Sequence, residues 1–342
     1  MGVYIKSSAQ ISIQNPLCND WAVSPIIYRE PYARAVECDY KKYINPIAAR
    51  RMGKILKRAI AVSSSALSIC GAAVPDAIIT GTGLGCIENT EKFLSAMTME
   101  GEEFLQPAYF INSTHNTISS QIAIFLKCHG YNNTFVQRGI SFESALLDAL
   151  MLFETGTVNT ALVEGHDEMT QGYFKLLDKL DYWRKEADGK GAVAGETAVG
   201  FFLSKEEDTV KIEGTEILHT PSMDDMSRSL LKMCSDAGIS LKDIDAVMVG
   251  ANTDEANDAV YEAFSETLFH GVPCLWWKHI FGESFTSAAF GMYVADYILR
   301  NRVVPSAMVW KNSVKSAEQI RKILIYNHFN NKEHSLILLS RW

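Results

Sequence analysis

The sequence has no pair of cysteines at the spacing of a metal-binding or redox motif. Its seven cysteines are scattered along the chain, at Cys18, Cys38, Cys70, Cys86, Cys128, Cys234 and Cys274. None of them stands in a CxxC or CxxxC arrangement, so neither a cysteine metal site nor a disulfide framework is predicted. We therefore expect no metal and no cofactor, and a reducing, cytoplasmic location.

Long apolar runs and an excess of positive charge are also missing. No apolar stretch approaches the roughly 18–20 residues of a membrane helix, and the first residues do not form a basic region followed by an apolar core. The net charge is −8, which argues against a general nucleic-acid binder. With 47% hydrophobic and 21% charged residues, the 342-residue chain has the composition of a globular protein of about two domains' length.

Short β-rich runs alternate with helical patterns, which predicts an α/β fold. The predicted strands are Asp76–Thr80, Thr134–Arg138, Thr160–Glu164, Ala198–Ser204, Asp245–Val249, Ser306–Trp310 and His334–Leu339. Several are almost continuously apolar, as expected for strands covered on both faces. Predicted helices include Ser141–Glu154, with Ser141 as its N-cap, and Ala288–Leu299.

An internal repeat indicates a duplicated fold. DAIITG, from Asp76, resembles DAVMVG, from Asp245, at an offset of 169, and the same offset relates Ser113–Leu126 to Gly282–Ala295. We expect two similar halves, residues 1–208 and 209–342, divided at the charged segment after Ser204. The alternative is that βα units simply look alike.

Several segments, spread over nearly the whole chain, resemble the β-ketoacyl synthases of the thiolase superfamily. They are NSTHNTISSQIAI (112–124), TFVQRGISFESALLDA (134–149), EGHDE (164–168), GETAVGFFLS (195–204), Asn257-Asp258 and KHIFGESFTSAAFG (278–291). The resemblance implies a thiolase-like duplicated fold with layers in the order α-β-α-β-α.

The catalytic residues of that family do not match. The family needs a cysteine nucleophile and two histidines, and the resemblance places these at Gly139, Gly250 and Glu283. The thiolate attacks the acyl group, and the histidines stabilise the enolate of the extender, which a carboxylate would instead repel. The family's C-terminal Gly-Phe-Gly-Gly loop is also replaced, by Asn327–His334. Because such residues act together, this chain is predicted to be inactive in condensation by itself.

The resemblance is nearest to the chain-length factors, especially the ketosynthase-like subunits of aryl-polyene and flexirubin-type pathways. Such subunits often carry Gln at the cysteine position, whereas Gln137 here stands two residues upstream. The resemblance implies a role in fatty-acid or polyketide-type biosynthesis, with an active ketosynthase and an acyl carrier protein as partners. It also implies that residues 133–138 form a strand pairing across a dimer axis, in a homodimer or a heterodimer.

Candidate site residues follow from this interpretation. Phe110, Phe135 and Phe142 are candidate walls of an acyl-chain cavity, although such residues more often belong to the core. His279 and Ser141 are weak catalytic candidates. Gly139 is expected to adopt a positive φ in a tight turn. The acidic and histidine side chains of EGHDE (164–168) are adjacent in sequence, so their convergence on a metal ion is not expected.

A basic segment is a candidate docking surface. Residues 29–58 contain nine basic and three acidic residues. Arg50, Arg51, Lys54, Lys57 and Arg58 are predicted to form a basic helical face for the acidic carrier protein or for the partner subunit. The alternative is a solvated surface without a partner.

Three functions remain open from the sequence. The first is a ketosynthase-like subunit that pairs with an active synthase and shapes its acyl cavity. The second is an enzyme with altered acyl-thioester chemistry, a decarboxylase or hydrolase that uses Glu283, His279 or Ser141. The third is a non-catalytic protein that binds acyl groups or acyl carriers.

Overall fold

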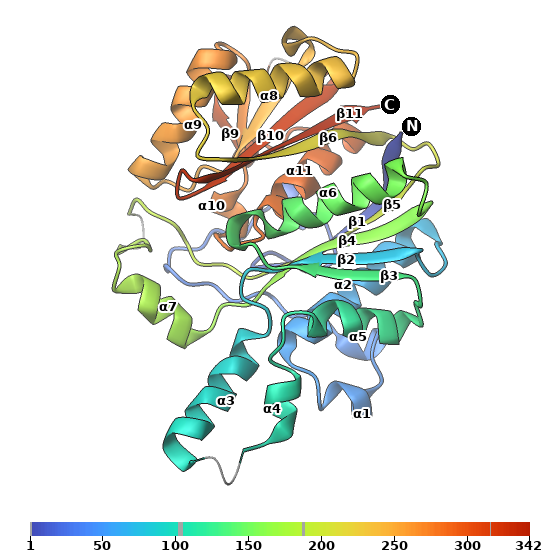
Figure 1. Cartoon of the computed structure of the whole chain (residues 1–342). Coiled ribbons are helices and arrows are strands. Elements are labelled where there is room, and N and C mark those ends of the chain that lie inside the picture. Colours follow the sequence, from blue (N-terminus) through green and yellow to red (C-terminus); the bar gives the residue numbers. More distant parts are fainter. Residues whose placement is uncertain (1, 102–104, 187–188, 315) are drawn as a thin grey trace.

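A computed structural model describes residues 2–101, 105–186, 189–314 and 316–342 (Figure 1). The strands are β1 Val3–Ile11, β2 Ala77–Gly81, β3 Tyr131–Phe135, β4 Thr160–Asp167, β5 Thr197–Ser204, β6 Val210–His219, β7 Ala246–Val249, β8 Cys274–Trp276, β9 Val309–Lys311, β10 Lys322–Phe329 and β11 Glu333–Arg341. The helices are α1 Pro46–Ala49, α2 Lys54–Cys70, α3 Ile87–Glu100, α4 Pro107–Ile111, α5 Thr117–Leu126, α6 Ser141–Glu154, α7 Gln171–Asp178, α8 Met223–Asp236, α9 Glu255–Leu268, α10 Lys278–Phe281 and α11 Ala288–Asn301.

The order of the strands repeats. In the first half it is β3-β2-β4-β5-β1, and in the second half it is β8-β7-β10-β11-β6, with β9 added beyond β8. The directions repeat as well: the first three strands of each series are parallel, and the last two pair antiparallel. β1 and β6 join the halves as an antiparallel pair. This topology confirms the predicted duplicated α/β fold.

The helices complete the predicted five layers. α6 and α11 lie between the two halves of the sheet, α2 and α5 cover the outer face of the first half, and α8 and α9 cover that of the second (Figure 1). α6 buries a face at helical spacing, Phe142, Ala145, Leu146, Ala149 and Phe153, in the core that it shares with α11. The expected boundary at residues 208 and 209 stays a prediction and falls in the connection from β5 to β6.

One of the two repeat matches is wrong. The match from Asp76 to Asp245 relates β2 to β7, which are topological equivalents. The second match relates α5 to α11, but the equivalent of α11 is α6, since each of these helices lies between the two halves of the sheet. Both matched segments pass from small, polar residues to an apolar helix, and that composition does not distinguish an outer helix from a central one.

The predicted strands and helices hold with local differences. β3 starts at Tyr131 and ends at Phe135, before the predicted end, because the chain turns at Arg138, whose φ is 51°. Residues Ser306–Met308 form a 3-10 turn before β9. Helix 141–154 has the predicted bounds, but its N-cap is Ile140, and the Ser141 hydroxyl instead donates to the Arg138 carbonyl at 2.8 Å.

Candidate functional site

Gly139, Gly250 and Glu283 are brought to one region, around the end of β10. Gly139 packs against Phe329, and a Cβ atom there would lie 2.7 Å from the Phe329 Cγ atom. A Cβ atom at Gly250 would lie 2.5 Å from both the Asn327 Oδ1 atom and the Tyr261 hydroxyl. Both glycines are therefore required by close packing, and neither position has room for a larger side chain without movement of its neighbours.

The expected positive φ at Gly139 is wrong. The left-handed residue of this turn is Arg138, with φ 51°, and Gly139 is needed only because Phe329 approaches it. Phe329 itself ends β10 and begins a tight turn in which Asn330 and Asn331 both have positive φ. Asn is among the residues that adopt this conformation most readily. The segment that replaces the family's glycine-rich loop thus places an aromatic ring against Gly139.

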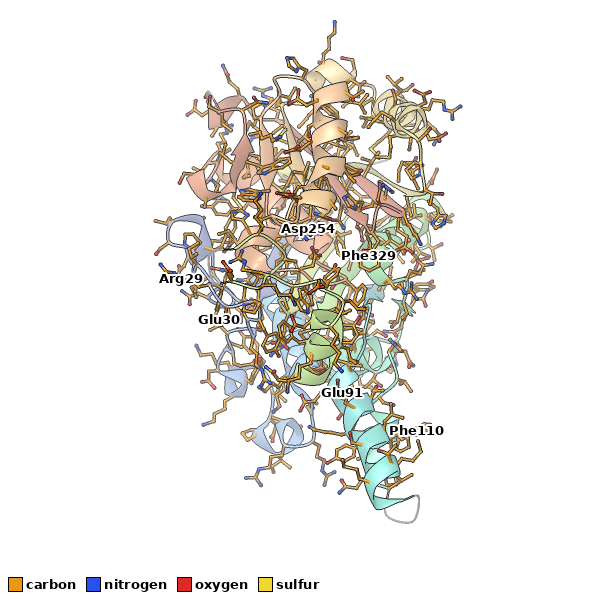
Figure 2. All side chains as sticks on the ribbon, turned by 90° about the vertical axis from the view of Figure 1, so that its left-hand side faces the viewer. Arg29, Glu30, Glu91, Phe110, Asp254 and Phe329 are labelled. Carbon is orange, nitrogen blue, oxygen red and sulfur yellow. The ribbon has the colours of Figure 1, made fainter. Side chains whose placement is uncertain are left out.

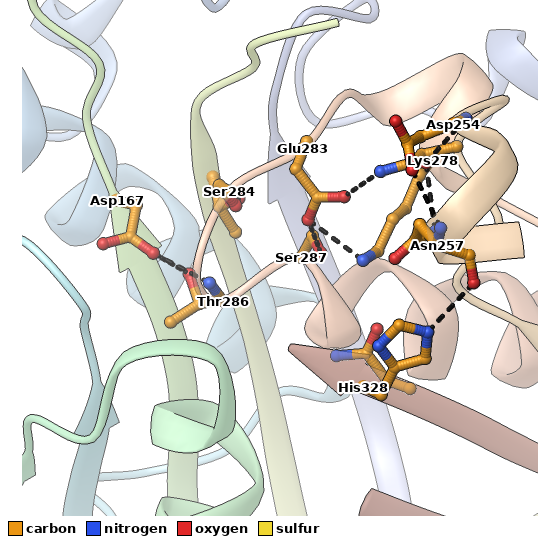
Figure 3. Close-up of polar contacts among 12 residues, drawn as sticks. Asp167, Asp254, Asn257, Lys278, Glu283, Ser284, Thr286, Ser287 and His328 are labelled. Atoms are coloured by element: carbon orange, nitrogen blue, oxygen red, sulfur yellow. Dashed lines mark hydrogen bonds and ion pairs between the residues drawn. The ribbon is translucent and has the colours of Figure 1, made fainter. Parts of the chain in front are cut away.

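Glu283 forms a buried ion pair with Lys278 (Figure 3). Its Oε1 atom lies 3.0 Å from the Lys278 Nζ atom, and its Oε2 atom accepts a hydrogen bond from the Asn252 amide at 2.9 Å. The Ser287 hydroxyl donates to Oε1 at 3.3 Å. Lys278 and Glu283 are 4% and 6% exposed, so the pair lies in a low-dielectric environment. The hydrogen bonds from Asn252 and Ser287 help to compensate the Glu283 charge there.

A second buried carboxyl, on Glu143, lies beside this pair and was not identified from the sequence. Glu143 belongs to the first turn of α6, and its Oε1 atom accepts a hydrogen bond from the Ser335 hydroxyl at 2.7 Å. Its Oε2 atom has no hydrogen-bond partner among the described residues. Burial raises the pKa of Glu143 to about 7, although Ser335, Asn327 and the Lys278 charge oppose the shift. The sequence offered no signal, because an acidic residue in the first turn of a helix is normally exposed.

The histidine of this region is His328. The expectation that His279 is a catalytic residue here is wrong. The His279 ring stacks on Trp276 at 3.8 Å and its Nε2 atom contacts the Ala307 carbonyl at 2.7 Å, on the side of β9. Burial lowers the pKa of His279 to about 4. His328 instead lies against Asn257 and Tyr261, and burial lowers its pKa to about 3, so this ring is neutral at physiological pH. Neither imidazole is arranged as a base for Ser141.

Two chambers open beside the ion pair. The first has a volume of about 370 Å³ and is lined by polar residues that include Asn252, Asp254, Lys278, Glu283 and His328. The second has a volume of about 180 Å³ and is lined mainly by apolar residues, Met169, Tyr173, Leu177, Leu180, Tyr182, Trp183, Phe285 and Phe329 among them. The chambers share walls, including Tyr182, Glu283 and Phe329.

Asp167 connects the two halves of the chain next to these chambers. Its carboxylate accepts hydrogen bonds from the backbone N–H groups of Gly83 at 2.9 Å, Leu84 at 3.1 Å and Thr286 at 2.8 Å, and from the Thr286 hydroxyl (Figure 3). Burial raises the pKa of Asp167, and these donors oppose the shift. The segment EGHDE thus anchors loops, and within the described residues no group of three or more His, Cys, Asp or Glu side chains is placed to hold a metal ion.

The three candidate wall residues have different surroundings. Phe142 has no exposed surface and packs against Phe201 in the core, so its expected role as a cavity wall is wrong. Phe110, on α4, is 58% exposed and lies well away from Phe329 (Figure 2). Phe135 is partly buried at the end of β3. The expected role of Phe110 and Phe135 as cavity walls therefore stays a prediction.

The predicted basic face is reduced to four residues. Arg50, Arg51 and Lys54 are exposed and Lys57 is partly exposed, but Arg58 is 1% exposed and cannot belong to a docking surface. The Arg58 guanidinium instead lies 2.8 Å from Glu37 and 3.0 Å from Glu196. A buried arginine with two carboxylate partners stabilises the local structure.

β3 is an edge strand of the sheet, paired with β2 on one side only. Exposed apolar residues surround it on the two helices that contact it and on the following loop, namely Ile124 (69% exposed), Phe125, Met151 and Val136. An open edge next to apolar side chains is a surface at which another chain can add. No helix within the described residues is long and apolar enough to cross a membrane.

Comparison with known proteins identifies the fold. No family model and no curated protein matches the chain. Solved structures that resemble it include the ishigamide ketosynthase/chain length factor, with a TM-score of 0.84 and 16% identity over 100% of this chain and 99% of that one. A β-ketoacyl synthase from Burkholderia phymatum STM815 resembles it with a TM-score of 0.83 and 14% identity over 100% of this chain and 99% of that one. A ketosynthase in complex with its chain length factor from Xenorhabdus doucetiae resembles it with a TM-score of 0.80 and 13% identity over 100% of this chain and 98% of that one. The chain therefore has the thiolase-like fold of the ketosynthases and chain-length factors, as the sequence predicted.

Proposed function

We propose that this chain is a ketosynthase-like subunit that carries out no condensation itself, pairs with an active β-ketoacyl synthase and shapes the cavity in which an acyl chain grows on a carrier protein. The pathway class that fits best is fatty-acid or polyketide-type synthesis, of the polyene kind. One observation carries the proposal: each position that the resemblance assigns to catalysis is closed by packing or engaged in an ion pair. Phe329 fills the space at Gly139, Asn327 and Tyr261 fill that at Gly250, and Lys278 binds Glu283.

The alternative of altered acyl-thioester chemistry has less support. A nucleophilic serine needs a base within hydrogen-bond reach. The Ser141 hydroxyl donates to the Arg138 carbonyl and accepts from the Gln137 N–H group, both at 2.8 Å, so its hydrogen bonds are to the backbone. His279 faces Ala307, and Glu283 is bound by Lys278 and Asn252.

The open edge of β3 supports pairing with a synthase of the same fold. A partner strand lying along β3 would satisfy the edge and cover Val136 and the apolar residues of α5 and α6. Phe135 lies partly buried at the end of this strand and is the first side chain that we assign to the wall of an acyl cavity formed between the two subunits. Phe110, on the projecting α3–α4 hairpin, is the second side chain that we assign to the partner's acyl cavity.

The exposed basic residues Arg50, Arg51, Lys54 and Lys57 are assigned to docking of the acidic carrier protein. They lie at the end of α1 and the start of α2, on a chain whose net charge is −8. A local positive surface on an acidic protein attracts an acidic partner during encounter.

Co-expression with a synthase that has an intact Cys-His-His set tests the proposal. We expect a stable complex with equal amounts of both chains. Val136→Glu should weaken that complex at least tenfold, whereas Leu231→Glu, at a 51% exposed leucine on α8, should leave it unchanged. With a carrier protein present, Phe135→Ala should shift the products to longer chains. No complex with any co-encoded synthase, or carbon–carbon bond formation by this chain alone, contradicts the proposal.

A further inference from the structure

The two chambers form one site with a polar end and an apolar end. Glu283 and Tyr182 line both, and Phe329 lies between them (Figure 2 shows Phe329 close to Asp254 of the polar chamber). Four polar residues of the first chamber are at least nine-tenths buried: Asn252, Lys278, Glu283 and His328. A preformed cavity with a few buried polar groups and an apolar wall is the usual form of a small-molecule site.

The charges of the polar chamber leave no cation free for an anionic ligand. Among its described lining residues, Lys278 is the one lysine or arginine, and its ammonium is bound to Glu283 at 3.0 Å. Asp181 and Asp254 add two further carboxylates to the lining. The carboxyls of Asp258 and Glu143 also interact with the Lys278 charge. A ligand carboxylate would therefore meet negative groups in a poorly solvated space.

The apolar chamber has the size of an aromatic ring. Its volume is about 180 Å³, and an apolar protein cavity of about 150 Å³ is large enough to bind benzene. Trp183, Phe285 and Leu177 form its walls. A phenyl ring or a short alkyl chain would contact mainly apolar atoms there.

We infer that the joined chambers bind an uncharged ligand with a phenyl or short alkyl group and one hydrogen-bonding head, and that Glu283 excludes carboxylates from this site. The apolar group enters between Trp183 and Phe285. The head meets the Lys278 ammonium, which has three N–H donors and needs only one for the bond to Glu283. This site lies within a single chain, so the inference does not depend on pairing with a synthase.

Two matched probes test the inference on the isolated full-length chain: 3-phenylpropan-1-ol and 3-phenylpropanoate, titrated by saturation-transfer NMR. The wild type should bind the alcohol at least tenfold more tightly than the carboxylate. Glu283→Gln keeps the shape of the side chain and frees the Lys278 charge, so it should tighten carboxylate binding at least tenfold. Equal binding of both probes by the wild type, or an unchanged ratio in Glu283→Gln, overturns the inference.

Two adjacent leucines of α7 provide the matched control. Leu177 lines the apolar chamber, whereas Leu176 is 59% exposed and points elsewhere. Leu177→Trp should weaken alcohol binding at least tenfold by filling the chamber, and Leu176→Trp should change it by less than twofold. The same response in both variants would place the probe outside the chambers and overturn the inference. Complex formation with a synthase is measured separately, so either proposal can fail alone.

Discussion

The buried carboxyl of Glu143 should make the stability of this protein fall as the pH rises. Glu143 has no exposed surface, and its Oε1 atom accepts from Ser335, whereas Oε2 has no partner within the described residues. Burial raises its pKa from 4.5 to about 7. Between pH 4.5 and pH 7, Glu143 is therefore protonated in the folded state and ionised in the unfolded state. Its contribution to the free energy of unfolding is complete below pH 4.5 and is lost as the pH rises through 7.

The magnitude follows from the two pKa values. One pH unit of difference corresponds to 1.36 kcal/mol, so the shift of Glu143 corresponds to roughly 3 kcal/mol. Glu143→Gln has the same shape, still accepts from Ser335 and does not titrate. The variant should exceed the free energy of unfolding of the wild type by only about 1 kcal/mol near pH 5 and by roughly 3 kcal/mol near pH 8.5.

Urea unfolding at several pH values between 5 and 8.5 measures this difference. Other buried acids with raised pKa values, such as Glu168, contribute to both proteins and cancel when the two are subtracted. Glu206→Gln, at a side chain that is 85% exposed, is the control and should give no pH-dependent difference. A difference between Glu143→Gln and the wild type that stays constant over this range refutes the reasoning, because Glu143 would then not titrate in it.

Two further variants test the packing of the site. Gly139→Ala should lower the free energy of unfolding by about 1–3 kcal/mol, because the added methyl group meets the Phe329 ring. Adding Phe329→Ala should recover part of that loss. The urea midpoints of the single and double variants measure both effects. Asp167→Ala leaves the buried N–H group of Thr286 and the part-buried N–H groups of Gly83 and Leu84 without this acceptor. An unpaired buried donor costs about 1–3 kcal/mol, so the free energy of unfolding should fall by at least that amount in urea titrations, and near wild-type stability would contradict the anchoring role.

The parts of the fold that the sequence predicted are those with a strong local pattern. α6 has apolar residues at helical spacing and the predicted bounds, and β5, β7 and β11 contain continuous apolar runs. β1 was missed because Lys6, Ser7, Ser8 and Gln10 interrupt its apolar pattern. Its polar side chains are satisfied by distant groups, as when Ser8 donates to Asp296 at 2.8 Å, and no local signal reveals such a partner.

The candidate site also has features that the sequence predicted and features that it did not. The absence of a cysteine at Gly139 needs only the residue identity, so the sequence was sufficient for it. The prediction for His279 failed because only the tertiary structure places His279 beside Ala307 and His328, within β10, beside Asn257. The prediction that Arg58 belongs to a basic docking face was wrong for a related reason. Helical spacing places Arg58 near Lys54, but its side chain is buried in the structure, and Glu37 and Glu196 neutralise its charge.

The three positions that the resemblance assigns to catalysis are each held by their neighbours in this protein. A cysteine at Gly139 would have to displace Phe329, and a histidine at Gly250 would have to displace Asn327 and Tyr261. Removing Glu283 would leave the Lys278 ammonium buried without its partner, which typically costs several kcal/mol. Because each position has different neighbours, no single substitution would make room for the family's residues at all three. These three positions are occupied by packing or by an ion pair, whereas the edge of β3 in the same chain is unpaired among the described residues.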